Sequence, residues 1–157
     1  MAIDMQSPAL TIALAVFVLY LIIHDWVTVP RFNEPRSGGI SPGQRAAISV
    51  GNVLPPLLLL ILVAVSPTTG PMPWWTVLWG AIYFVAFLVL VWLSWYQPYL
   101  RGTTPERTAS YEAEFAGTIH VLPSRGDHPR PNLAHVVLHL LMLVCLVLFF
   151  ARVFSGL

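Results

Sequence analysis

The chain has 157 residues, of which 57% are hydrophobic and 10% are charged, and its formal net charge is +1. A soluble domain carries about 25% charged residues, so we do not expect water to be the main solvent of this chain. The near-neutral charge leaves no broad basic face, which argues against nucleic acid as a partner.

Four segments are long and apolar enough to cross about 30 Å of hydrocarbon as α-helices. The first becomes polar at His24 and Asp25 before Pro30 stops it, and tryptophans and tyrosines gather at both ends of the third. These features predict an all-α fold, a four-helix transmembrane bundle that forms one integral membrane domain. We expect the spans at residues 9–29, 46–65, 74–95 and 133–154.

Two adjacent prolines lie in the middle of the second span. Pro55 and Pro56 offer no N–H to the carbonyls four residues earlier, which predicts a kink or local unwinding. An amide in hydrocarbon is costly without a partner, so Asn52 should face another helix. Two hypotheses remain open. Asn52 and Ser49 either join helices by hydrogen bonds, or they line a polar pocket with Arg45, as broken helices do in transporters.

The connection at residues 96–132 is the largest segment that we expect outside the membrane. Two threonines followed by Pro105 are typical of a helix start. Three apolar residues then recur at a spacing of four: Tyr111, Phe115 and Ile119. This stripe predicts a short amphipathic helix at the membrane interface, between the third and fourth spans. Asn132 is placed to cap the fourth span.

The arginines predict the orientation in the membrane. Seven of the eight lie in the first and third connections: Arg31, Arg36, Arg45, Arg101, Arg107, Arg125 and Arg130. By the positive-inside rule these connections are cytoplasmic, and both termini lie outside. We therefore expect a multi-pass protein of a plasma (inner) membrane.

This orientation places all five histidines on the cytoplasmic side. His135 and His139 are four residues apart and share one face of the fourth span. Such a pair can bind a metal. The resulting hypothesis is a metal ion or haem held at the cytoplasmic rim by a set of five candidate ligands: His24, Asp25, His128, His135 and His139. The alternative is that these histidines make hydrogen bonds between helices or meet water.

The stretch RAAISVGNVLPPLL, residues 45–58, resembles the second helix of the four-span membrane glutathione transferase and eicosanoid family. In that family an arginine precedes an asparagine by seven residues, and Arg45 and Asn52 take these positions here. The resemblance implies a transferase that conjugates lipophilic substrates and uses these two residues in its active site. The chain departs from the family at Pro55, where a glutamate is usual, and in its long connection between the third and fourth spans.

The sequence carries no Walker motif, nucleophile elbow, CxxC or HExxH pattern. Our leading hypothesis is therefore a non-catalytic accessory or interaction subunit in the lipid bilayer. Its cytoplasmic connection would bind a protein partner or a second copy of the chain. The first alternative is a metal- or haem-dependent membrane redox enzyme, and the second is the transferase. These hypotheses leave open whether the protein is an enzyme.

Overall fold

The computed structural model describes residues 6–33, 41–115 and 117–155, and within them it contains helices and no β-strand. The long helices are α1 (Gln6–Trp26), α2 (Pro42–Ala64), α3 (Trp74–Val91) and α6 (Leu133–Ser155). A π-helix, η1 (Trp92–Tyr96), and α4 (Gln97–Arg101) continue α3, and α5 (Pro105–Phe115) follows. The predicted all-α fold with four membrane-length helices is confirmed.

The outer faces of the long helices are suited to lipid. Each helix is long and apolar enough to cross a membrane, and large apolar side chains such as Val85 and Val147 point outward and are exposed. Because water would penalise so much exposed apolar surface, these faces are expected against lipid chains. The protein is a multi-pass membrane protein.

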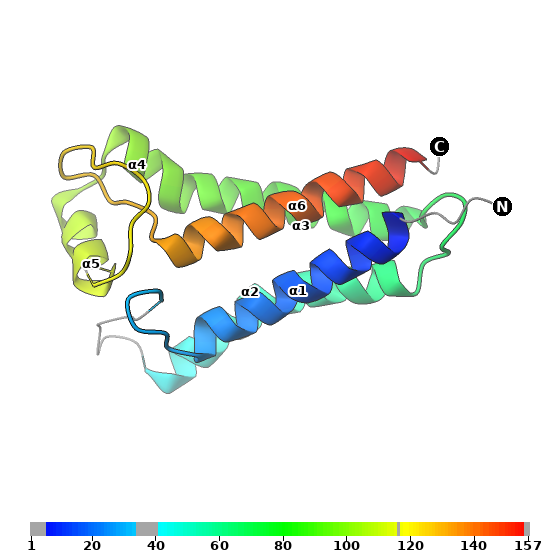
Figure 1. Cartoon of the computed structure of the whole chain (residues 1–157), viewed down its shortest axis with the longest axis horizontal. Coiled ribbons are helices and arrows are strands. Elements are labelled where there is room, and N and C mark those ends of the chain that lie inside the picture. Colours follow the sequence, from blue (N-terminus) through cyan, green and yellow to red (C-terminus); the bar gives the residue numbers. More distant parts are fainter. Residues whose placement is uncertain (1–5, 34–40, 116, 156–157) are drawn as a thin grey trace.

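The helices form a ring in which α1 packs along α2 and α6, while α3 contacts α2 and α6. Phe17, Leu59, Phe84 and Phe149 are among the buried core side chains, and they come from all four long helices. The start of α1, the end of α6 and the α2–α3 connection lie together, and we call this the terminal end (Figure 1). The opposite end, which carries α5 and the end of α1, is called the connection end (Figure 1).

The second long helix passes through its two prolines. Pro55 and Pro56 lie inside α2, which stays helical from Pro42 to Ala64. Of the kink or local unwinding predicted there, the unwinding is therefore wrong, and the kink stays a prediction. The missing donors remove two hydrogen bonds, and the helical turns on both sides keep theirs. The Pro55 carbonyl accepts the indole N–H of Trp79 on α3 at 3.2 Å, which ties α2 to α3.

The third span is longer than predicted and contains a π-helix. The Gln97 N–H bonds to the carbonyl of Trp92, five residues back, which leaves the Leu93 carbonyl without its α-helical donor. Pro98 has no N–H for the Ser94 carbonyl. The Arg107 guanidinium donates to the carbonyls of Leu93 and Ser94, both at 3.3 Å. Helical structure therefore continues from Trp74 to Arg101.

Two predicted helix starts are confirmed by their caps. The Thr104 hydroxyl accepts the Arg107 N–H at 3.4 Å at the start of α5, and the Asn132 side chain accepts the His135 N–H at 3.0 Å at the start of α6. Tyr111 on α5 lies against Trp95, with ring centroids 5.2 Å apart. The short helix between the third and fourth spans is present, and its position at a membrane interface stays a prediction.

Candidate functional site

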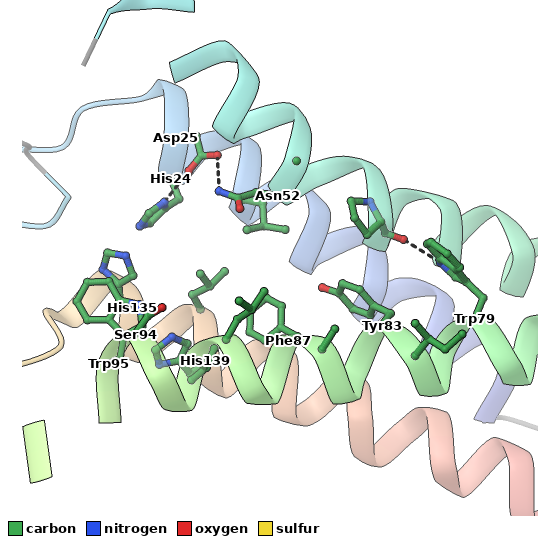
Figure 2. A pocket seen from close by; sticks show the side chains of 18 residues that line it. His24, Asp25, Asn52, Trp79, Tyr83, Phe87, Ser94, Trp95, His135 and His139 are labelled. Atoms are coloured by element: carbon green, nitrogen blue, oxygen red, sulfur yellow. Dashed lines mark hydrogen bonds and ion pairs between the residues drawn. The ribbon is translucent and has the colours of Figure 1, made fainter. Parts of the chain in front are cut away.

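A cavity of about 400 Å³ lies among α1, α2, α3 with η1, and α6. Its wall is mainly apolar, and α3 contributes several of the apolar residues, including Ile82, Phe87 and Leu90. The polar side chains that line it gather toward the connection end, as Figure 2 shows. The site is therefore an apolar chamber with one polar end.

His24 and Asp25 form a pair at the end of α1. His24 Nδ1 lies 2.9 Å from Asp25 Oδ1, and because an ionised carboxylate only accepts hydrogen bonds, Nδ1 carries the donated proton. The other Asp25 oxygen accepts the side-chain amide of Asn52 at 3.3 Å. The Asn33 amide donates to the carbonyls of His24 at 3.0 Å and Val27 at 2.8 Å, which closes the end of α1.

Asn132 fixes the second histidine of the site. Its Oδ1 accepts the backbone N–H of His135 at 3.0 Å and lies 2.7 Å from the ring Nδ1. An oxygen that already accepts a backbone N–H faces Nδ1 as an acceptor, so the neutral ring keeps its lone pair on Nε2. The ring of Trp95 lies against His135, with centroids 3.8 Å apart. The His24 ring is 4.9 Å from His135.

His139 lies one turn further along α6 and lines the same cavity. Its ring centroid is 6.3 Å from that of His135, and its Nδ1 lies 3.2 Å from the Tyr96 hydroxyl. Four of the five predicted ligands thus line one cavity: His24, Asp25, His135 and His139. Within the described residues, no three His, Cys, Asp or Glu side chains are placed to hold a metal ion. The metal set stays a prediction without supporting ligand geometry.

His128 lies away from the other histidines. Its Nδ1 is 2.9 Å from the carbonyl of Tyr99, and it lines a different cavity with Arg101 and Asp127. The connection folds back here onto α4, so that a Cβ on Gly102 would lie 3.1 Å from the His128 ring. A set of five ligands in one site is therefore not formed.

The predicted polar residues of α2 are divided between two kinds of contact. Ser49 is buried and accepts the indole N–H of Trp26 at 2.8 Å, which joins α1 to α2. Asn52 joins the same two helices through Asp25 and also lines the cavity. Both hypotheses for Asn52 thus describe real contacts, whereas Ser49 makes a contact between helices.

A second cavity of about 230 Å³ adjoins the polar end, and four of its lining residues also line the first: His24, Asp25, Asn52 and His135. Arg45 and Glu114 line the second cavity. Burial raises the pKa of the Glu114 carboxyl above its ordinary value. His24 and His135 therefore lie between the apolar cavity and a smaller cavity whose lining includes the charged residues Arg45 and Glu114.

Some polar atoms at these cavities lack partners. His24 Nε2, the Tyr83 hydroxyl and Asn132 Nδ2 are buried, and within the described residues they make no hydrogen bond. Sequence analysis did not identify Tyr83, although a tyrosine in the middle of an apolar span is a signal of a polar neighbour. Buried polar groups without partners are costly, so a water molecule or a ligand that bonds to these atoms would stabilise the site.

The cavity opens between α2 and α3. Its wall residues Ile82 and Leu90 on α3 are 53% and 62% exposed, and Gly51 and Asn52 on α2 are exposed as well. In a bilayer this opening faces lipid chains.

Comparison with models of protein families, with curated proteins and with solved structures finds no match for this chain. The geometry of the site is therefore what indicates a function for this protein.

Proposed function

We propose that this protein binds a small amphipathic molecule dissolved in the bilayer. The apolar part of this molecule lies in the 400 Å³ cavity, and the polar group of the molecule lies beside His24, Asp25 and His135. The observation that carries the proposal is the shape of this cavity, which has apolar walls and several polar side chains at one end. Cavities of about 300–1,000 Å³ with apolar walls and few convergent polar groups are typical of ligand sites.

The cost of the polar end supports a functional role. Ionisable side chains in membrane spans are expensive and usually serve a binding or transfer function. His24, Asp25, His135 and His139 all lie within membrane-length helices and line this one cavity. Helix association alone needs fewer polar groups, since pairs such as Trp26 with Ser49 supply it.

The other hypotheses have less support. A bound metal ion would need the histidines to rearrange, because no three ligand-type side chains within the described residues are placed for an ion, and a bound haem stays a prediction. The role of an accessory subunit has no contact in the described residues that favours it, and it stays a prediction. Arg45 and Asn52 both line the smaller cavity, and the transferase hypothesis has no support in the described residues beyond this shared lining.

The test fills the cavity without touching its polar end. Ala86 lines the cavity and is exposed within it, whereas its neighbour Val85 is exposed and lies outside the lining. We expect saturable binding of para-octylphenol to the wild-type protein in lipid nanodiscs. Ala86→Phe should weaken this binding about tenfold or more, because the phenyl ring occupies the space of the ligand.

Val85→Phe adds the same ring on the outer face and is the matched control, which should bind as the wild type does. No saturable binding to the wild type, or equal affinities of the two variants, would contradict the proposal. An absorption spectrum and metal analysis of the same purified protein belong to the experiment. A stoichiometric metal or haem would overturn the proposal in favour of the redox hypothesis.

We also propose that the connection end faces the cytoplasm in a plasma (inner) membrane. The arginine-rich connections join helices at that end (Figure 1), as the positive-inside rule requires of cytoplasmic segments. Cysteines introduced as Thr69→Cys and Ser110→Cys should be labelled from outside and from the cytoplasm, respectively. Cys145 is buried and should stay silent. The reverse labelling pattern would overturn the orientation.

A further inference from the structure

We infer that the polar group of the bound molecule is a hydroxyl that donates its hydrogen bond to Nε2 of His24. The class of ligand is thus a lipophilic phenol or alcohol. The inference rests on the proposed function and deepens it, since it names which head group the polar end of the cavity accepts.

The first step is the proton on the His24 ring. Nδ1 is 2.9 Å from an Asp25 carboxylate oxygen and carries the donated proton. In the tautomer that carries its proton on Nδ1, the imidazole has its lone pair on the other nitrogen. That nitrogen, Nε2, is buried and has no hydrogen-bond partner within the described residues. It needs a donor that the described residues do not supply.

The second step is His135, which presents the same chemistry. Asn132 Oδ1 holds its Nδ1–H at 2.7 Å, so the neutral ring also has its lone pair on Nε2. The two rings are 4.9 Å apart and line the same cavity. A head group at the polar end therefore meets two imidazoles whose remaining nitrogens accept hydrogen bonds, and a group that only accepts finds no donor on either ring.

The third step excludes charged head groups. No arginine or lysine lines the 400 Å³ cavity, whereas Asp25 does, so an anionic head would meet a carboxylate without a counter-charge. An ammonium head would have to share Asp25 with His24 and Asn52, which already donate to its two oxygens, and the rest of the cavity wall is mainly apolar. A neutral donor satisfies His24 without displacing either contact. Deeper in the cavity, the unpartnered Tyr83 hydroxyl can donate a hydrogen bond to an oxygen further along the ligand (Figure 2).

The experiment compares para-octylphenol with para-octylanisole, in which a methyl group replaces the hydroxyl hydrogen. Both are titrated into the wild-type protein in lipid nanodiscs. We expect the phenol to bind about tenfold or more tightly, because the ether leaves His24 Nε2 unsatisfied. If neither probe binds saturably, the proposed function falls. If both bind with equal affinity, the cavity binds lipophiles and the hydroxyl inference is overturned.

Variants locate the effect on one ring. His24→Phe should bind both probes with similar affinity, since a phenyl ring cannot accept the hydrogen bond. His128→Phe changes a histidine that lies in a different cavity and should keep the full preference for the phenol. Nitrogen NMR of isotopically labelled histidine measures which ring nitrogen carries the proton in the wild-type protein, so this measurement does not depend on whether a variant folds. A protonated Nε2 on His24 in the wild type would overturn the inference.

Discussion

The two ends of the helix bundle differ in how closely their helices pack and in whether their buried polar groups have partners. At the terminal end, Gly80 of α3 lets the ring of Phe149 approach so closely that a Cβ would lie 2.2 Å from it. Arg152 is buried there and donates to the carbonyls of Pro67 and Gly70 at 3.0 Å and 2.9 Å. The backbone of the α2–α3 connection is thereby fixed to α6.

At the connection end, the helices separate around a cavity, and polar atoms such as His24 Nε2 remain without partners. Close packing and satisfied polar groups therefore provide the stability of the bundle, whereas the open end carries the features of a binding site. Substitutions at the terminal end should therefore reduce stability, and those at the connection end should mainly change binding.

The largest effect should come from Arg152→Met. The variant leaves two carbonyls of the α2–α3 connection without their charged donor, and we expect it to lower the free energy of unfolding by about 3 kcal/mol. Denaturation in mixed micelles measures the change. Arg101→Met alters an exposed arginine and should cost less than about 0.5 kcal/mol. Equal losses from both variants would contradict the role assigned to Arg152.

Gly80→Leu should have the next largest effect. The added side chain must displace Phe149, and overpacking of this kind costs about 2 kcal/mol. Gly51→Ala is the matched control, because a Cβ at Gly51 meets nothing within 4 Å and alanine favours a helix. The same denaturation assay should show a loss for the first variant and none for the second. A neutral Gly80→Leu would show that the terminal end is not closely packed.

A smaller effect is expected for Asn132→Ala. Two measurements, of stability and of ligand binding, distinguish the two roles of this residue. Loss of the helix cap should cost about 1 kcal/mol. Because Asn132 also orients the His135 ring, binding of para-octylphenol should weaken too. Asn132→Asp keeps the acceptor oxygen and should restore much of the stability. An alanine variant that binds as the wild type does would remove His135 from the site.

The smallest effect should be a dependence on pH at the connection end. Burial and then the charge of Arg130 lower the pKa of His120 from its ordinary 6.5. The unfolded chain therefore takes up a proton at a higher pH than the folded protein does, so stability declines as the pH falls below 6.5 toward the folded pKa. His120→Gln should remove this part of the decline. Identical pH profiles of stability for the two proteins would refute it.

Much of the fold could be predicted from the sequence because a bilayer imposes length and hydropathy on each helix. The caps at Thr104 and Asn132 followed from local hydrogen bonding. The π-helix did not, since it depends on Arg107 of the next helix to satisfy the freed carbonyls of Leu93 and Ser94. Local patterns carry no information about such a distant donor.

The candidate site was predictable in part. Sequence spacing placed His135 and His139 on one face, and the convergence of His24 with them followed from counting spans. Spacing could not place His128, because its position depends on the return of the connection onto α4. Nor could it identify the unpartnered hydroxyl of Tyr83, because the cavity around that residue exists only between packed helices.

Photo-crosslinking with an alkylphenol that carries a diazirine on its chain shows where such a ligand binds in the protein. In nanodiscs, we expect label on cavity residues such as Ala86 and Leu90, and an excess of para-octylphenol should remove it. Label on the outward-facing Val147 reports simple contact with lipid and should not be competed. Cavity label that persists under competition, or label confined to the outer faces, would contradict a binding site in this cavity.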